Sequence, residues 1–152
     1  MNLATADFFL SSPNHLTFST RLLSELGNSH SKLRATTQRS GSAVVVYAGG
    51  EIDACNESTW RRLLAEAAAA VTPPGTLVID TSGLGFMGCC AFSVLADQVE
   101  ACGRRGIELC LVSCQAVVPR IVEACGLHEL LTVHPSVDSA LATDLGADTP
   151  VL

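Results

Sequence analysis

Short apolar runs alternate along this chain with longer segments whose apolar residues recur every three to four positions. The runs typical of buried strands are residues 43–47, 76–80, 107–112 and 130–133. The segments with helical spacing are residues 60–71, 92–99 and 117–125, followed by a last helix capped by Ser136. Strands joined by helices of this length form right-handed crossovers, which make the strands parallel. The alternation therefore predicts an α/β fold.

The region before these strands predicts an antiparallel addition to the sheet. Residues 32–38 also match a strand, and a turn at residues 39–42 joins them to residues 43–47 as a hairpin. We expect a mixed sheet of about five strands, with a parallel core and an antiparallel edge hairpin, and about four helices. The expected parts are one domain at 32–145, an N-terminal extension at 1–31 that is a frayed helix or a disordered arm, and a C-terminal tail at 146–152.

Size and hydrophobicity exclude several classes of protein. The chain has 152 residues, of which 48% are hydrophobic, and this is enough for one well-buried domain. No run of about 18 apolar residues is present to cross a membrane. No basic residue precedes Arg21, so the pattern of a signal peptide is missing as well. We expect a cytoplasmic protein that does not bind membranes.

Charge is divided unevenly between the extension and the domain. Residues 1–40 carry four Lys and Arg against two Asp and Glu, whereas residues 41–152 carry five against thirteen. An acidic domain repels a phosphate backbone, and its arginines are not interleaved with aromatic residues that could stack on bases. We therefore expect no nucleic acid partner and favour a protein partner with a basic surface.

Cysteine is abundant for a cytosolic chain, with seven residues at positions 55, 89, 90, 102, 110, 114 and 125. The odd number and the ample apolar content argue against a secreted disulfide scaffold, and leave mostly reduced thiols with room for one or two redox pairs. The nearest approach to a Cys-x-x-Cys pair is Cys110-x-x-x-Cys114, and His128 and His134 do not stand at metal-ligand spacing. We expect no metal and no cofactor.

The segment Phe86-Met87-Gly88-Cys89-Cys90-Ala91 places two adjacent thiols between an expected strand and an expected helix. The free N–H groups at a helix start favour anions, so a thiol at this position is readily ionised and reactive. Alternatively, these cysteines pack as small hydrophobic residues, as free cysteines often do. The sequence by itself leaves both interpretations open.

An ordered set of short motifs runs through the domain. The motifs are Gly50-Glu51-Ile52-Asp53, Leu77-Val78-Ile79-Asp80-Thr81-Ser82-Gly83-Leu84, Phe86-Met87, Arg105-Gly106-Ile107, Leu111-Val112, Gly126-Leu127 and His134-Pro135-Ser136-Val137. Their order and spacing resemble the STAS domain of bacterial anti-sigma-factor antagonists, over roughly residues 32–145, and look most like its actinobacterial branch. The resemblance implies the STAS fold and a protein-binding switch without catalytic residues.

The resemblance also implies a partner. Such antagonists bind an anti-sigma factor, typically an ATP-binding serine kinase, and displace the sigma factor that it holds, so that transcription resumes. Phosphorylation of a serine at the start of the second helix ends the interaction, because a phosphate adds about 1.5 to 2 negative charges to the binding surface. We expect this chain to be a monomer or a weak dimer.

The chain departs from the family at this switch. The family turn reads roughly Asp-Ser-Ser-Gly, with the second serine as acceptor. Aligned on Phe86-Met87, these four positions are Gly88, Cys89, Cys90 and Ala91, so no phosphoacceptor stands at the family position, Cys90. Three interpretations compete: a constitutively active antagonist, a redox switch in which a thiol forms a disulfide or mixed disulfide, and a degenerate domain that no longer binds.

Partner contacts are expected where the alignment places the switch. Asp53, in the Gly-Glu-x-Asp turn beside it, could meet an arginine of the anti-sigma factor, or could instead cap the first helix. Leu84, Phe86 and Met87 are expected in the core rather than at the contact. The residues expected to contact the partner are Asp53, Gly88, Cys89, Cys90 and Ala91, with Val94 and Leu95 on the helix that follows.

The redox candidates are Cys89, Cys90, Cys114 and Cys125. If the second and third helices lie side by side after parallel strands, their starts are neighbours, which places Cys114 closest to the switch and Cys102 near Cys125. A bridge from Cys125 to the switch would need a tilted or offset third helix. Ten helical residues rise about 15 Å, whereas a disulfide joins Cα atoms roughly 4.4–6.8 Å apart.

Two other functions stay open. Vicinal cysteines at a helix start suggest a thiol-disulfide oxidoreductase, although the Cys-x-x-Cys spacing of that chemistry is absent. The second is a scaffold module of a signalling assembly. An enzyme would turn over a model disulfide, an antagonist would bind an anti-sigma factor stoichiometrically, and a scaffold would self-assemble.

Overall fold

The computed structural model describes residue 16 and residues 18–148, with side chains up to residue 142. The extension before residue 16 and the tail from residue 149 lie outside the described residues. The elements in chain order are α2 (Thr20–Leu26), β1 (Leu33–Ser40), β2 (Ala43–Ile52), α3 (Glu57–Ala69), β3 (Gly75–Met87), α4 (Cys89–Arg104), β4 (Ile107–Val112), α5 (Val117–Ala124), β5 (Thr132–His134) and α6 (Val137–Asp148).

The five strands form one mixed sheet in the order β1-β2-β3-β4-β5. β1 and β2 pair antiparallel as the hairpin, and the other three pairings are parallel. The predicted α/β fold, the antiparallel edge hairpin and the four expected helices are all confirmed. The described residues add a fifth helix, α2.

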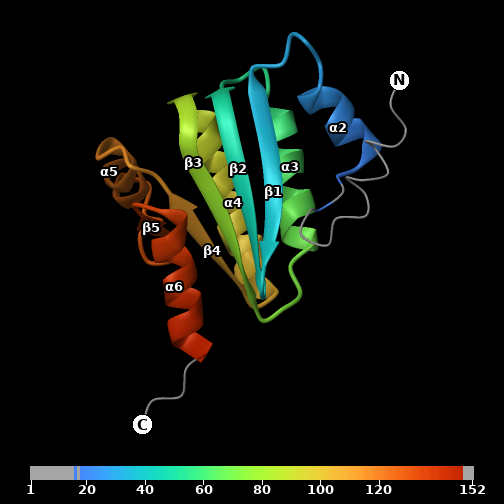
Figure 1. Ribbon diagram of the computed structural model, residues 1–152. Coiled ribbons are helices and arrows are strands. Elements are labelled where there is room, and N and C mark those ends of the chain that lie inside the picture. The colour runs from blue at the N-terminus through green and yellow to red at the C-terminus, as the bar shows by residue number, and fades with distance from the viewer. Residues whose placement is uncertain (1–15, 17, 149–152) are drawn as a thin grey trace.

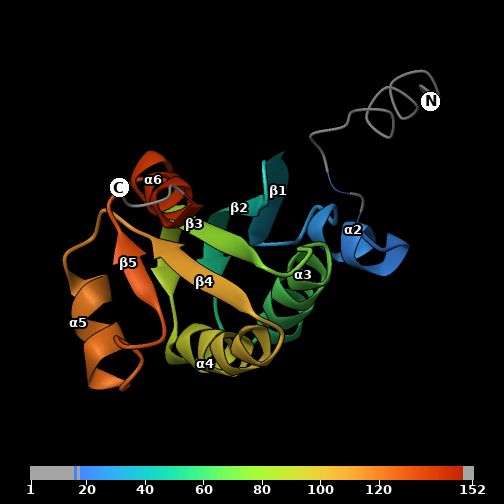
Figure 2. The ribbon, with the colours of Figure 1, turned by 90° about the horizontal axis from the view of Figure 1, so that it is seen from below.

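Helices cover the sheet unequally on its two faces. Figures 1 and 2 show α3 and α4 packed on one face, with α2 beside α3 and α5 near the β5 edge, whereas α6 lies on the opposite face. The larger core fills the space between the sheet and α3 and α4, and its fully buried members include Trp60, Leu77 and Leu95. A smaller core under α6 contains Val45, Val78 and Cys110. Because α3 and α4 share the larger core, the start of α4 packs on the same face of the sheet as α3.

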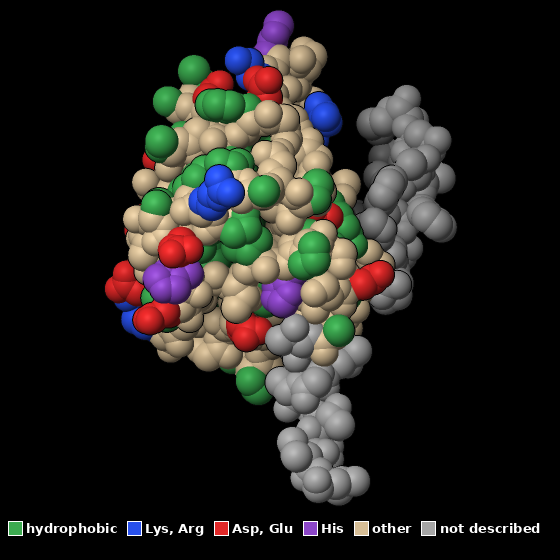
Figure 3. Space-filling view, turned by 90° about the vertical axis from the view of Figure 1, so that its left-hand side faces the viewer, with side chains coloured by type: hydrophobic (Ala, Val, Ile, Leu, Met, Phe, Trp, Pro, Cys, Tyr) green, Lys and Arg blue, Asp and Glu red, His purple; other side chains and the backbone are tan. Residues whose placement is uncertain are grey.

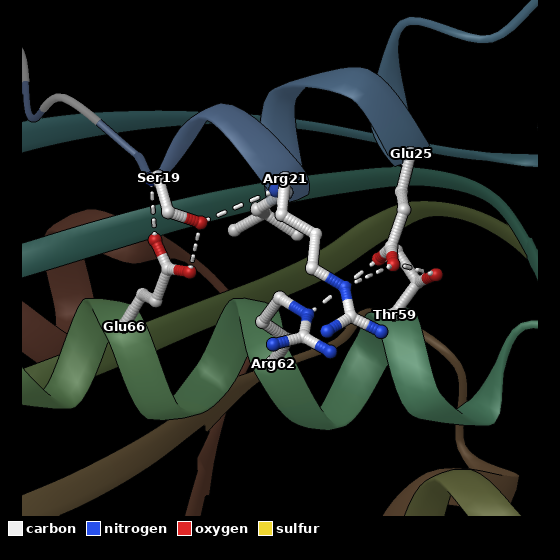
Figure 4. A network of polar contacts seen from close by, with 7 residues as sticks. Ser19, Arg21, Glu25, Thr59, Arg62 and Glu66 are labelled. Carbon is white, nitrogen blue, oxygen red and sulfur yellow. Dashed lines mark hydrogen bonds and ion pairs between the residues drawn. The ribbon is translucent and has the colours of Figure 1, made fainter.

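Helix α2 belongs to the expected extension but packs onto the domain. Leu22 is fully buried and Phe18 nearly so. Polar contacts fix the start of the helix: the backbone N–H and the hydroxyl of Ser19 donate to the two carboxylate oxygens of Glu66 at 2.7 and 2.5 Å (Figure 4). Leu22 lies on the buried side of this helix, whereas Leu23, which belongs to the same weak apolar spacing, is exposed.

Strand β3 is longer than the sequence suggests. The expected strand was residues 76–80, but β3 continues to Met87, so a single residue, Gly88, separates it from α4. Its second half stays paired with β2 because the register shifts twice, between Tyr47 and Gly49 and between Gly50 and Glu51. These irregularities break the alternation of buried and exposed side chains, which explains why the sequence pattern ended early. The last strand is also displaced, to Thr132–His134.

Candidate functional site

The ends of β2 and β3 meet the first residue of α4 at one edge of the sheet. Glu51 lies opposite Phe86 and Ile52 opposite Met87 in the parallel register. The N–H of Gly88 then donates to the carbonyl oxygen of Ile52 at 2.9 Å. The segment expected to be a switch loop is therefore an extension of the sheet that turns into a helix at one residue.

The first turn of α4 divides its residues between solvent and core. Cys89 is exposed and Cys90 is half-buried, whereas Ala91 is fully buried. A Cβ added to Gly88 would lie 3.7 Å from the Cys90 sulfur, so this thiol lies close to the turn at Gly88. The side chain of Ala91, expected at the partner surface, faces the core in this structure.

The expected burial of the other side chains in this region agrees only in part with the structure. Val94 and Leu95 are fully buried, so the exposed side of α4 starts with Cys89 and Ser93 instead. Leu84 is buried as expected and Met87 is half-buried. The prediction for Phe86 was wrong, because its side chain is 53% exposed. Phe86 follows the register shift between Gly50 and Glu51, whereas Met87, the last residue of β3, still lines the hollow beside α4.

A buried hydrogen bond holds the start of α4 against α3. The indole Nε1–H of Trp60 donates to the carbonyl oxygen of Ala91 at 3.2 Å, and Trp60 is completely buried. A tryptophan in a core ordinarily needs such a partner for its N–H group. Together with the bond from Gly88 to Ile52, it fixes the position from which Cys89 projects.

Asp53 organises the turn between β2 and α3. Its Oδ1 accepts the N–H of Cys55 at 2.9 Å, and its own N–H donates to Oδ1 of Asn56 at 2.9 Å. Asn56, not Asp53, is the N-cap residue of α3. The second carboxylate oxygen lies 3.5 Å from the Lys32 ammonium, whose side chain is 60% exposed. An ion pair so close to solvent is weak, so this oxygen can exchange its cation.

Two adjoining hollows open beside this edge. The first, of about 170 Å³, lies between the end of β3 and the start of α5, and its walls include Phe86, Gln115 and Val117. The second, of about 430 Å³, lies between α4 and α5, and its walls include Cys89 and Cys125. Met87, Phe92 and Ile121 line both. Figure 3 shows hydrophobic side chains gathered in the upper half of the face on the α5 side.

The cysteines that line the second hollow differ from the pair of neighbours that the sequence predicts. Cys125, at the end of α5, lines the same hollow as Cys89, whereas Cys114 is exposed and is not among its lining residues. The end of α5 thus shares a hollow with the first turn of α4, and the start of α5 lines the adjoining hollow together with Phe92. None of the seven cysteines forms a disulfide in this structure.

Cys102 was expected near Cys125, but it lies in the core while Cys125 is exposed. Burial raises the pKa of the Cys102 thiol, and the nearby positive charge of Arg105 offsets part of the shift. Among the residues that the structure describes, no group of three or more His, Cys, Asp or Glu side chains could hold a metal ion. Within the same residues, no helix is long and apolar enough to cross a membrane.

Comparison with known proteins agrees with this geometry. Residues 34–140 match the profile of the STAS domain. The Mycobacterium tuberculosis protein named "Putative anti-anti-sigma factor Rv2638" is 57% identical over 131 residues, which cover 86% of this chain and 87% of that protein. The anti-sigma-F factor antagonist RsfA of the same species is 53% identical over 110 residues, which cover 72% of this chain and 86% of RsfA.

Solved structures give the same result. The crystal structure of an anti-sigma factor antagonist from Mycobacterium paratuberculosis superposes with a TM-score of 0.64 and 25% identity, covering 73% of this chain and 92% of that one. The fold and the β3–α4 edge define a STAS-type α/β domain. The chain belongs to the STAS domain family, and the relatives it resembles there are anti-sigma factor antagonists.

Sequence reasoning located the β3–α4 edge but not the hollows beside it. The walls come from β3, α4, the loop before α5 and α5 itself, and no motif in the chain connects these segments. The signal in the sequence was the spacing of apolar residues: Val117, Ile121 and Cys125 recur at helical intervals in a short helix. Such spacing indicates a buried face, and it gives no sign that part of that face stays open.

Proposed function

We propose that this chain is an anti-sigma-factor antagonist that binds an anti-sigma factor of the serine-kinase type in the cytoplasm and so releases its sigma factor. The observation that carries the proposal is the start of α4, where Cys89 is exposed and Cys90 half-buried at the family's switch position, in a chain more than half identical to proteins named as such antagonists. Those relatives are regulatory proteins rather than enzymes, and binding by this chain is stoichiometric.

The proposed binding edge is already rigid in the free protein, before the partner binds. Cys89 projects from a helix start that Trp60 and Ile52 hold in place, and the Asp53 carboxylate stands at the end of the neighbouring strand. A preorganised surface loses little conformational freedom on binding. Asp53 exchanges Lys32 for a cation of the partner, and the complex excludes the sigma factor by competition.

The partner's kinase activity does not inactivate this antagonist. At the family's acceptor position stands the Cys90 thiol, which a serine kinase does not ordinarily phosphorylate. The nearest hydroxyl on α4 belongs to Ser93, one turn further along, where it lies 3.5 Å from the carbonyl oxygen of Cys89. The antagonist therefore remains active in the presence of ATP.

Oxidation takes the place of phosphorylation as the control. Cys89 and Cys125 line one hollow, and a peroxide would convert the two thiols into a disulfide: hydrogen peroxide accepts two electrons and both thiol protons, and leaves as two molecules of water. The bond would tie the end of α5 to the first turn of α4 and alter the binding surface. Reduction by a dithiol restores both thiols.

The test is a binding assay with purified anti-sigma factors of the serine-kinase class from the same organism, with ATP, under reducing and oxidising conditions. We expect the reduced chain to bind with ATP present and to carry no phosphate. Failure of the reduced chain to bind any of them would refute the function. Binding that ATP abolishes, together with phosphate on this chain, would refute the unphosphorylatable switch.

Single variants test the redox control separately. We expect peroxide to weaken binding of the wild type, whereas Cys89→Ser and Cys125→Ser keep full binding after oxidation. Cys55→Ser and Cys114→Ser are matched controls, because both thiols are exposed but lie outside the hollow. Equal binding by oxidised and reduced wild type would remove the redox control and leave a constitutive antagonist.

A further inference from the structure

The described part of the chain exposes four large hydrophobic side chains, and two of them lie together. They are Leu23, Phe86, Val117 and Leu130, between 50 and 63% exposed. Phe86 and Val117 both line the first hollow, although 31 positions separate them in the sequence. Exposed apolar side chains scattered singly need no explanation, whereas apolar side chains gathered around a hollow mark a contact surface.

The two hollows form one continuous apolar trough. Met87, Phe92 and Ile121 belong to both, so the floor runs unbroken from Phe86 to Cys125. The wall on α4 consists of residues 89, 92, 93 and 96, at the spacing of one helix face. The wall on α5 consists of residues 117, 118, 121 and 125, of which 117, 121 and 125 have the same kind of spacing. The polar side chains among the lining residues are Thr81, Ser93, Ser113 and Gln115.

Walls of this form match a helix better than a small molecule. Val117 and Cys125 are eight helical residues apart, which corresponds to about 12 Å, or two turns. An amphipathic helix fills such a groove with apolar side chains at positions i, i+3 or i+4, and i+7. Residues 41–152 carry five basic against thirteen acidic residues, so the polar side of the occupant should be basic.

The trough is also continuous with the proposed binding edge, because Cys89 is both the first residue of α4 and part of the trough wall. We infer that the trough between α4 and α5 docks an amphipathic helix of the anti-sigma factor, with its apolar side inward and basic residues at its flanks. This inference rests on the proposed function. It adds a second, apolar contact to the polar one at Asp53.

Four single substitutions form a matched set, because all four side chains are at least half exposed and none should be needed for folding. Val117→Glu and Phe86→Ser alter the trough, and Leu23→Glu and Leu130→Glu alter the surface elsewhere. The measurement is the Kd for a purified anti-sigma factor that binds the reduced wild type, with urea unfolding as the check on folding. We expect at least a tenfold loss for both trough variants and less than a twofold change for both controls.

The failures are distinguishable. If the reduced wild type binds no anti-sigma factor, the proposed function fails and the inference with it. If it binds, but Val117→Glu and Phe86→Ser bind equally well, only the trough inference is overturned. Equal losses in all four variants would also overturn it, because the effect would not be specific to the trough.

Methyl NMR signals of Val117 and Ile121 identify the occupant. We expect them to shift when the anti-sigma factor is added and to stay constant when the free chain is diluted. A shift on dilution would make the occupant a second copy and overturn the inference. If replacing Phe8 and Phe9 with serine shifts these signals in the free full-length chain, the occupant of the trough is the chain's own N-terminal segment. This result would also overturn the inference.

Discussion

The indole N–H of Trp60 in α3 donates to the carbonyl oxygen of Ala91 in the first turn of α4, across 3.2 Å of the buried core. This bond couples the helix after β2 to the helix after β3. Since the backbone of Gly88 is also bonded to Ile52, the first turn of α4 is held from two directions. The switch region of this protein is accordingly a fixed edge.

Replacing Trp60 with phenylalanine should loosen that edge. The variant loses one buried hydrogen bond and part of a fully buried ring, so we expect the free energy of unfolding to fall by about 2 kcal/mol. Urea unfolding measures the loss, and hydrogen exchange at the amides of residues 89–92 reports whether it is local. Unchanged exchange at these amides would mean that the bond does not position α4.

Replacing Glu66 with alanine should release α2 from α3. Both carboxylate oxygens of Glu66 accept bonds from Ser19 (Figure 4). Glu25 of α2 keeps two further polar contacts with α3, a hydrogen bond from the Thr59 hydroxyl at 3.0 Å and an ion pair with Arg62 Nε at 3.7 Å. We expect a loss of about 1–2 kcal/mol and faster hydrogen exchange at Leu22 and Leu23. Glu100→Ala is the control, because Glu100 makes only an exposed pair with Arg104, so its effect should stay below about 0.5 kcal/mol.

Alkaline pH should destabilise the fold through Cys102. Burial raises the pKa of this thiol above its ordinary value of 9.0, so the folded state holds its proton at a pH where the unfolded state releases it. Stability is then complete below about pH 9 and declines as the pH rises from there toward the folded pKa. Urea unfolding between pH 7 and 10.5 should show a smaller decline for Cys102→Ala than for the wild type. Cys55→Ala, at an exposed position, should follow the wild type, and equal slopes in all three proteins would contradict the prediction.

Replacing Cys90 with serine should restore the missing phosphoacceptor. The hydroxyl would stand one residue into α4, and the free N–H groups of a helix start favour a phosphate. We expect the anti-sigma factor and ATP to transfer about one phosphate per chain to Cys90→Ser, and none to the wild type or to Cys89→Ser. Mass spectrometry of the intact chain checks this. Adding Gly88→Asp should be tolerated, because a Cβ there meets nothing closer than 3.4 Å.

The architecture was predictable because most helices and strands have a characteristic spacing of apolar residues in the sequence. The strand at residues 107–112 and the helix marked by Val117 to Cys125 were located from apolar spacing alone, and the hairpin from its turn. The segment from Phe86 to Ala91 was also located between a strand pattern and a helix pattern, and the alignment with the family turn singled out Gly88. The N-terminal helix was less clear, since only one side of a single short helix, at Phe18 and Leu22, is buried.

The exposure of individual side chains was less predictable. Phe86 was expected inside and Ala91 outside, and the structure reverses both. Ala91 is buried because the first turn of α4 packs against α3, where the indole of Trp60 donates to the carbonyl oxygen of Ala91. For Phe86, the reason is the pair of register shifts between β2 and β3, each of which changes which strand side chains face the core. A local pattern of hydrophobic residues carries no record of such shifts.

By itself, the sequence determined the family, the order of strands and helices, and the presence of thiols at the positions aligned with the serines of the family pattern, because these depend on residue type and local spacing. Only the tertiary structure decided that Cys89 shares a hollow with Cys125 instead of Cys114, and that Phe86 and Val117 meet beside it. Those relationships depend on the angle at which α5 lies against α4. Such an angle is set by the packing of many side chains at once, so no single segment of the sequence encodes it.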